Sequence, residues 1–482
     1  MSEEDLRAAE FHSAIELIAL SPFPHRMEAS HIDQLVHGDA VRPVVEVGDD
    51  SSPPSPSALA EEGHDDAVTN RITIVQDDFN TGGVQKIFGT LANGLVSDRN
   101  QVEVVVYRNE GPWRQHLDPR ISVWELQPSS SVAGRLAALR SQPCLFPQLL
   151  RPVLIAPHLA DRFKYLKSLA NYLRQRRPTS LLTATPYINI EAVLARSLAH
   201  CLVRLVVSER THLSQSVLGG SLRNNRRWHR RYLGPVIKET YNTADAIIAI
   251  SQGVADDLVR LGVNAEKIHV VYNPVIGCDF AERLSKSASH PWANEKSVPL
   301  LLFVGRFAPQ KDVPTLLKAF SILLMKRPAR LLLLGGSGDD SKFEMQQQRI
   351  FERANELGVR KSIDVIGFEN NPLPYMRECS VFVLSSLFEG FGNVLVEALA
   401  AGATIVSTDC PSGPSEILNG GQFGKLVPVG DAEALAAALL QALDCPGDKE
   451  GRLDWVERFR SDVAIEQYEK LVNIRKVRAE SG

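Results

Sequence analysis

Short apolar runs alternate with helix-like stretches from residue 71 onward. The run Ile72-Thr73-Ile74-Val75 is followed by Gly82 and Gly83 and then by an amphipathic helical pattern over 84–96. The alternation recurs, with further predicted strands at 102–107, 180–183, 202–207, 246–250 and 268–271. Strands that alternate with helices predict a parallel sheet covered on both faces.

A second series of the same kind follows a polar stretch at 288–297. Its predicted strands lie at 299–304, 330–334, 363–366, 381–384, 404–407 and 425–427. A chain of 482 residues also exceeds the ~250–300 residues at which single cores stop growing. We therefore predict an α/β protein with two doubly wound, parallel-sheet domains at 71–287 and 288–454. Ligands bind beyond the carboxyl ends of such strands, so two facing domains would share a cleft.

The first 70 residues differ in composition from the rest. They contain 15 Asp or Glu and three Arg, a charge of −12, whereas the whole chain has −4, so the remainder sums to +8. The segments 49–57 and 61–66 have the acidic, Ser- and Pro-rich composition of a disordered linker. We predict that 1–70 is a disordered acidic extension. The basic remainder suits an anionic ligand or membrane surface.

Composition predicts a soluble cytoplasmic protein. Hydrophobic residues make up 44% and charged residues 23%, and the apolar runs fall far below the ~20 residues of a spanning helix. Acidic residues near the N-terminus and the lack of a long apolar run there favour a chain that is not secreted. The six cysteines lie at least 31 residues apart, a spacing that predicts free thiols rather than a metal or redox pair.

The stretch from Ser385 to Gly402 carries the most specific chemistry. A predicted strand runs into Glu389-Gly390-Phe391-Gly392, and a helical pattern rich in Ala, Leu and Val follows. The free amides and the dipole at a helix start form an anion site that suits a diphosphate. If the helix begins near Phe391, Glu397 lies two turns in and is placed to accept hydrogen bonds from a diol such as ribose. The alternatives are a helix-capping role for Glu389 and a solvated helix face for Glu397.

Two loops add to this picture. Arg306 and Lys311 bracket a loop after the first strand of the second series, where they would clamp a diphosphate and stabilise a charged leaving group. The alternative is that both are solvated loop cations. Gly82 and Gly83 follow the first strand of the chain, and their lack of a Cβ lets the backbone approach a ligand closely.

Together these pieces resemble the retaining glycosyltransferases of family 4, which have the GT-B fold of two Rossmann-like domains. The resemblance covers roughly residues 71–468. Its matching residues are Gly82-Gly83, Ala244-Asp245-Ala246-Ile247-Ile248-Ala249-Ile250-Ser251, Asn273-Pro274, Gly305-Arg306 with Lys311, Glu389-Gly390-Phe391-Gly392 with Glu397-Ala398, and Pro411-Ser412-Gly413-Pro414-Ser415-Glu416-Ile417. It also implies that a C-terminal helix in 455–482 packs back on the first domain.

The resemblance implies a role for each site residue. Arg306 and Lys311 would hold the diphosphate of a nucleotide-sugar donor, with UDP expected from the family, and Glu397 would hold the ribose. Glu389 would face the sugar together with the backbone from Gly390 through Phe391, Gly392, Asn393 and Val394, while Gly82 and Gly83 would close the site from across the cleft. No metal or other cofactor is expected, because the cations and the helix start stabilise the charge.

Retention of the anomeric configuration has two possible routes. Two displacements would need a carboxylate nucleophile beside the anomeric carbon, and the sequence offers no convincing candidate. We favour departure and attack on the same face, with the donor phosphate taking the acceptor proton. Some relatives place a functional His directly after the strand predicted at 202–207. Here Ser208-Glu209-Arg210-Thr211 intervenes before His212, so that role is not assigned to His212 or Glu209.

Two segments are candidates for the acceptor or membrane side. Five arginines recur with helical spacing, so that one helix face would carry them all: Arg223, Arg226, Arg227, Arg230 and Arg231. With Trp228 and Tyr232 nearby, this face suits an anionic membrane or a polyprenyl diphosphate head group; the alternative is a solvated basic face. The segment 145–157, apolar and interrupted by prolines, is either an acceptor loop or a buried irregular connection.

The sequence therefore predicts a cytoplasmic glycosyltransferase, peripheral to the membrane, that extends a lipid-linked or polysaccharide glycan and does not bind nucleic acid. One alternative is a non-hydrolysing nucleotide-sugar epimerase of the same fold, which would convert the donor without an acceptor. The other is a nucleotide-sugar-binding protein without catalysis, which would keep donor affinity but show no turnover.

Overall fold

The structure is a computed structural model that describes residues 70–80, 82–142, 145, 147–149, 163–218, 233–336, 340–447 and 450–473. The predicted N-terminal extension, most of the segment 145–157 and the five arginines between 223 and 231 lie outside these residues. Among the helices that the structure describes, none is both long and apolar enough to cross a bilayer.

Two parallel sheets form the framework. The first sheet has the strand order β3-β2-β1-β4-β5-β6-β7, and the second has the order β10-β9-β8-β11-β12-β13. The strands of the first are β1 Asn70–Gln76, β2 Asn100–Val106, β3 Ser122–Glu125, β4 Ser180–Ala184, β5 Arg204–Glu209, β6 Ala246–Ala249 and β7 Ile268–Val270. Those of the second are β8 Leu300–Gly305, β9 Arg330–Gly335, β10 Ile363–Ile366, β11 Val381–Leu384, β12 Ile405–Thr408 and β13 Lys425–Val427. The predicted class, two doubly wound α/β sheets, is confirmed.

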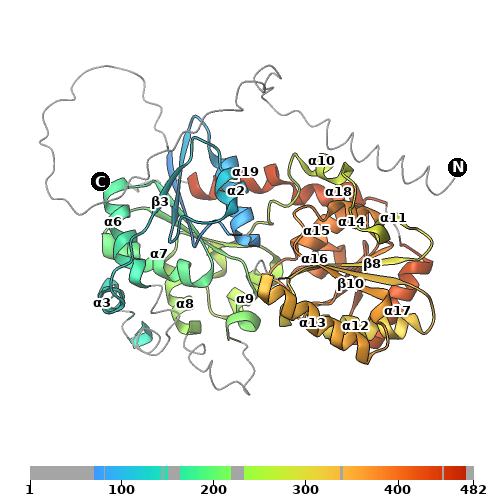
Figure 1. The fold of residues 1–482 in the computed structure, drawn as a ribbon. Coiled ribbons are helices and arrows are strands. Elements are labelled where there is room, and N and C mark those ends of the chain that lie inside the picture. Colours follow the sequence, from blue (N-terminus) through green and yellow to red (C-terminus); the bar gives the residue numbers. More distant parts are fainter. Residues whose placement is uncertain are drawn as a thin grey trace, which may run out of the picture. The chain divides into compact units, whose positions relative to one another are not determined.

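Helices connect successive strands of both sheets (Figure 1). The helices described between residues 83 and 260 include α2 Gly83–Leu95, α3 Ser131–Ser141, α6 Leu166–Arg176, α7 Pro186–Ala199, α8 Leu233–Thr243 and α9 Gln252–Arg260. Those from 280 to 400 are α10 Phe280–Ser285, α11 Pro291–Asn294, α12 Val313–Leu324, α13 Asp340–Glu356, α14 Leu373–Glu378 and α15 Asn393–Ala400. The last are α16 Pro414–Ile417, α17 Ala432–Asp444, α18 Arg452–Val456 and α19 Ser461–Asn473.

Every strand predicted from the apolar runs is present, with ends that differ by up to two residues. The run at 202–207 begins late as a strand, because Leu202 is fully exposed and β5 starts at Arg204. The prediction missed β3, an edge strand whose sequence Ser-Val-Trp-Glu has no fully buried position. A strand that is only half covered carries a weaker hydrophobic signal than a central one.

The C-terminal helix α19 packs into the core of the first sheet. Tyr468, Leu471 and Val472 are buried in the same cluster as the β1 residues Ile72 and Ile74. Figure 1 shows α19 beside α2. The chain passes between the sheets at two neighbouring places, since the main-chain amides of Val275 and Ile276 both donate to the carbonyl of Phe459. The hydrophobic core beside the first sheet therefore includes residues that are about 400 positions away from β1 along the chain.

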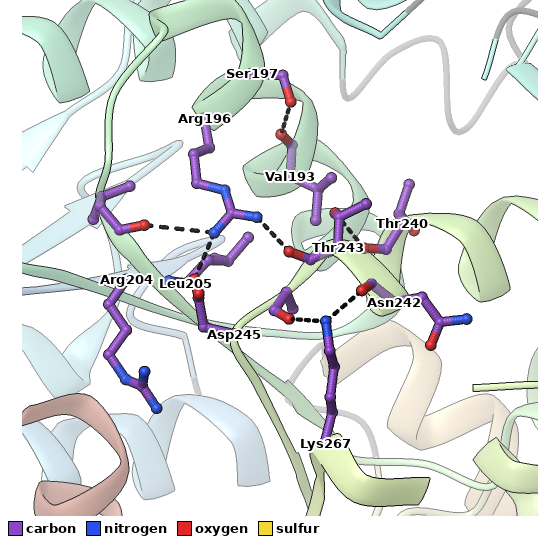
Figure 2. Close-up of polar contacts among 12 residues, drawn as sticks. Val193, Arg196, Ser197, Arg204, Leu205, Thr240, Asn242, Thr243, Asp245 and Lys267 are labelled. Carbon is purple, nitrogen blue, oxygen red and sulfur yellow. Dashed lines mark hydrogen bonds and ion pairs between the residues drawn. The ribbon is translucent and has the colours of Figure 1, made fainter. Parts of the chain in front are cut away.

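A partly buried ion pair anchors the start of β6 (Figure 2). Arg196 on α7 donates to Asp245 Oδ2 at 2.6 Å, and the same oxygen accepts the amide of Leu205 on β5 at 2.9 Å. Lys267 donates to the carbonyl of Ala244 at 3.0 Å. Asp245 belongs to the stretch that matches the family, and its contacts at the amino end of the strands are structural.

The contact between α2 and α19 gives a stability prediction. A Cβ at Gly94 would overlap Ile465, with Cγ1 only 2.7 Å away, whereas a Cβ at Gly89 on the same helix would lie 4.0 Å from Trp113. Gly→Ala in a helix stabilises by up to about 1 kcal/mol where there is room. We expect Gly89→Ala to raise the free energy of unfolding measured in urea, and Gly94→Ala to lower it.

The Ile465 side chain provides the control for this prediction. Adding Ile465→Ala to Gly94→Ala removes the overlap, so the double variant should be more stable than Ile465→Ala alone. Equal stability of Gly94→Ala and Gly89→Ala would show that α19 does not pack on α2 in this way.

Candidate active site

The helix start after β11 is shaped by glycine. Gly392 is the residue before α15 and has φ 102°, a left-handed value that favours glycine. The helix thus begins at Asn393, two residues later than the predicted start near Phe391. Within the described part of the chain, no carbonyl accepts the amide hydrogens of Asn393 or Val394. Both amides remain available to an anion beyond the helix start.

Glu389 lies in the loop before this helix and is held by a lysine. Its Oε1 accepts hydrogen bonds from Lys311 Nζ at 2.5 Å and from Ser386 Oγ at 2.6 Å. The Glu389 and Lys311 side chains are only 8% and 12% exposed. Since α15 has no side-chain cap, the alternative of a helix-capping Glu389 is wrong. Removing only one partner of such a buried pair strongly destabilises the fold, because the other charge is left unpaired.

Glu397 lies one turn into α15 rather than the two turns predicted, and it faces a cation from the first domain. Its Oε1 is 3.6 Å from Nζ of Lys86 on α2. Its side chain is only 11% exposed, which contradicts the alternative of a solvated helix face. Sequence reasoning missed Lys86, because nothing in the local pattern of α2 distinguishes it from a solvated lysine.

Arg306 and Lys311 occupy different environments. Lys311 ends a short turn, Pro309–Lys311, and is tied to Glu389. Arg306 is exposed, and among the described residues its guanidinium has no ion-pair or hydrogen-bond partner. The two residues of the predicted clamp thus differ: Lys311 is fixed by its ion pair with Glu389, whereas the exposed Arg306 is available to a ligand.

The glycine loop of the first domain leads into α2. Gly82 precedes the helix and Gly83 is its first residue. A Cβ at Gly83 would meet no atom within 4 Å, so the space beside it is open, whereas one at Gly82 would overlap the side-chain amide of Gln85. Asp78, which the sequence analysis did not single out, accepts hydrogen bonds from Asn80 N and Gln85 Nε2, both at 3.1 Å, and so shapes the loop.

The loops of the two domains meet at Gly390. A Cβ at this position would overlap the carbonyl oxygen of Arg210, and the Gly390 carbonyl accepts a hydrogen bond from Ser251 Oγ at 2.8 Å. Because only glycine permits this approach, the residue type at 390 is fixed by the contact between the domains. The predicted residues Glu389, Gly390 and Glu397 are therefore brought to the edge of the first domain.

Glu416 strengthens the same interface. Its two carboxylate oxygens accept the amide hydrogen of Gln252, at 3.0 and 2.9 Å, and so cap the start of α9 from the other domain. Burial raises the pKa of this carboxyl group despite hydrogen bonds from Gln252 and Tyr272. A cavity of about 420 Å³ lies beside Glu416, lined by Gly253 and Trp455 among others. Glu416 was recognised from the sequence only as part of a matching motif.

Glu209 and His212, which the sequence left without a role, are both buried. Glu209 accepts hydrogen bonds from Tyr241 Oη at 2.7 Å and from the amides of Arg210 and Thr211, so it shapes the loop that touches Gly390. His212 Nδ1 lies 3.3 Å from Asp257 Oδ2 on α9, and burial lowers its pKa. These contacts give both side chains structural partners. No cluster of three or more His, Cys, Asp or Glu side chains in the described segments is arranged to hold a metal ion.

The pKa of Glu209 gives a testable pH dependence. Burial raises this pKa from 4.5 to about 7, so the folded chain holds the proton more tightly than the unfolded chain. The stabilisation is fully present below pH 4.5 and is lost as the pH rises through 7, with a slope that approaches roughly 1.4 kcal/mol per pH unit. Glu209→Gln cannot titrate. We expect the free energy of unfolding of the unsubstituted chain to fall relative to this variant between pH 4.5 and 7; parallel curves would contradict the buried, protonated carboxyl.

Comparison with known proteins finds glycosyltransferase families along both halves of the described chain. The model for glycosyl transferases group 1 matches residues 286–462, and the model for glycosyltransferase family 4 matches residues 81–276. A solved structure of Anabaena HepE with UDP-glucose has a TM-score of 0.62 and 18% identity, and covers 84% of this chain and all of that one; it shows the fold.

Two curated relatives extend the comparison. N-acetylgalactosamine-N,N'-diacetylbacillosaminyl-diphospho-undecaprenol 4-alpha-N-acetylgalactosaminyltransferase of Campylobacter jejuni is 30% identical over 210 residues, which are 43% of this chain and 53% of the relative. The exopolysaccharide phosphotransferase of Streptomyces coelicolor is 32% identical over 406 residues, 81% of this chain and 39% of the relative. The matches thus span about half or less of these relatives. With both halves of the described chain matched by family models and two parallel sheets of the expected kind, the chain belongs to glycosyltransferase family 4 and has the GT-B fold.

Proposed function

We propose that this protein transfers a sugar from a nucleoside-diphosphate donor, UDP-linked by family analogy, to a lipid-linked or polysaccharide glycan, with retention of the anomeric configuration. The observation that carries the proposal is the start of α15. Two free amides lie there between two buried glutamates, and each glutamate is paired with a lysine. This arrangement offers an anion site flanked by acceptors for hydroxyl groups.

The diphosphate of the donor fits the cations and amides around Asn393. The amides of Asn393 and Val394 would donate to one phosphate, and Arg306 is exposed and available as a planar fork. Lys311 has three donors, of which one is directed at Glu389, so the others remain for a phosphate oxygen. These groups would stabilise the negative charge that develops on the leaving nucleoside diphosphate. We propose that the reaction needs no metal.

The two glutamates would hold the hydroxyl groups at either end of the donor. Glu397 would accept hydrogen bonds from the ribose, with Lys86 beside it to offset the carboxylate charge. Glu389 would accept from the sugar, and its bonds to Lys311 and Ser386 fix its orientation. We propose that Glu389 remains a hydrogen-bond acceptor and that the acceptor attacks the face from which the nucleoside diphosphate departs.

The acceptor side rests on relatives and on sequence. The Campylobacter jejuni relative is named for a diphospho-undecaprenol acceptor, which supports a lipid-linked glycan for this chain. Arg223, Arg226, Arg227, Arg230 and Arg231 stay a prediction for contact with an anionic membrane or a diphosphate head group. On this view the reaction takes place at the cytoplasmic face of the membrane.

The donor site can be tested by binding and turnover. UDP, GDP and ADP and their sugars would be screened by thermal shift, and the binding donor would then be assayed for transfer to an undecaprenyl-diphosphate-linked saccharide. We expect one nucleoside diphosphate to raise the unfolding temperature. Lys311→Met combined with Glu389→Gln removes both buried charges together, so the fold should persist while transfer falls by roughly a hundredfold or more. Lys326→Met, at an exposed lysine of the second domain, is the matched control and should transfer normally.

The outcomes separate the possible functions. Transfer with an unchanged anomeric configuration, read from the anomeric proton by NMR, supports the proposal, and inversion contradicts the retaining part of it. Conversion of the donor without an acceptor would identify an epimerase. Donor binding without any turnover would identify a binding protein, and no binding of any nucleotide would refute the donor site.

A further inference from the structure

Arg210 lies in the loop after β5 and contacts three separate parts of the chain. Its Nη1 donates to Tyr468 Oη on α19 at 3.0 Å, and its Nη2 donates to Asn273 Oδ1 at 2.7 Å. The guanidinium also lies over the ring of Phe88 on α2, 5.2 Å from the centroid. A planar group held at its edge and its face has one orientation, so Arg210 is a fixed donor.

Asn273 passes this orientation on to the start of α15. A guanidinium can only donate hydrogen bonds, so the side-chain atom of Asn273 that faces Arg210 must be the carbonyl oxygen. Its amide nitrogen therefore faces the other way, and it donates to Asn393 Oδ1 at 2.7 Å. Asn273 is only 4% exposed, so water cannot readily replace Asn393 as the hydrogen-bond partner of this amide.

The chain of bonds fixes which end of the Asn393 amide is free. Because Asn393 Oδ1 accepts from Asn273, the Nδ2 of Asn393 points elsewhere, and no acceptor among the described residues takes the Nδ2 hydrogens. Asn393 is also the first residue of α15, where its own main-chain amide is free. Its side chain and main chain can thus donate to one anion.

We propose that Arg210 is a positioning residue for the donor diphosphate. Acting through Asn273, it holds the Asn393 side chain with Nδ2 directed to a phosphate oxygen and Oδ1 directed away from it. This inference rests on the proposed function, because the phosphate belongs to the nucleotide-sugar donor. It makes the first domain and α19 part of the donor site, although they lie outside the loop that binds the nucleotide.

Reversal of the bond direction tests the proposal. Asn273→Asp keeps the acceptor for Arg210 but replaces the donor to Asn393 by a second oxygen. The Asn393 amide must then turn, with Nδ2 toward Asp and Oδ1 toward the phosphate. Asn273→Ala removes the link and leaves the Asn393 amide free to rotate. The affinity for the nucleoside diphosphate that binds the unsubstituted chain would be measured by calorimetry, together with the unfolding temperature without ligand.

The order of the two variants separates a positioning role from a structural one. We expect Asn273→Asp to unfold at or above the temperature of the unsubstituted chain and to bind the nucleotide more weakly by roughly tenfold or more. The affinity of Asn273→Ala should lie between those of Asn273→Asp and the unsubstituted chain. If the Arg210–Asn273–Asn393 hydrogen bonds only hold the domains together, Asn273→Asp preserves these bonds. Asn273→Ala should then bind the nucleotide more weakly than Asn273→Asp. That order, or normal affinity in Asn273→Asp, would overturn the proposal.

Two controls address charge and the domain contact. The added carboxylate also repels the nucleotide through space, and a loss of affinity caused by this repulsion would shrink at high ionic strength, because salt screens it. A loss caused by the turned Asn393 amide should persist at high ionic strength. Arg204, the first residue of β5, also donates a hydrogen bond to α19, to the carbonyl of Leu471 at 2.7 Å, and Arg204→Met should leave affinity unchanged. If the unsubstituted chain binds no nucleoside diphosphate, the proposed function fails and this inference fails with it; if it binds and Asn273→Asp binds equally well, only this inference fails.

Discussion

The close approach of Gly390 to the carbonyl of Arg210 is the constraint on which the site depends. No side chain fits between these two loops, and the hydrogen bond from Ser251 to the Gly390 carbonyl holds the approach. It brings the start of α15 to the edge of the first domain. The pairing of Glu397 with Lys86 and the link from Asn273 to Asn393 both cross the same interface. A donor bound at α15 would therefore be in contact with groups from both sheets.

The interface is stabilised by elements that are distant along the chain. Glu416 caps α9 from the second domain, and Tyr468 on α19 bonds the guanidinium of Arg210. Each contact pairs a charged or polar group with a partner that satisfies it, as buried polar groups require. If Arg210 positions Asn393 as proposed, a substitution of Tyr468 on α19 would alter donor binding through Arg210 without changing a residue that contacts the donor.

Most of the framework could be predicted from local sequence, and the connections across the interface could not. Central strands such as β11 are continuous apolar runs, and Glu389-Gly390 marks the loop after it, so both are readable from a short window. The start of α15 was predicted two residues early, because the left-handed conformation of Gly392 is set by the loop. Lys86, Asp78 and Arg210 were missed since their roles arise from partners that the fold, not the sequence, brings near. The same holds for β3, whose edge position weakens its pattern.

The contact between Gly390 and Arg210 is tested most directly by the rate of sugar transfer by Gly390→Ala. The added methyl group would overlap the carbonyl of Arg210 and separate the two loops, while the core of each sheet stays intact. We expect a variant that unfolds as cooperatively as Gly89→Ala but transfers sugar roughly a hundredfold more slowly, because a displacement of about 1 Å at a reacting site has an effect of that size. A Gly390→Ala protein that transfers sugar at the unsubstituted rate would contradict the central role of this contact.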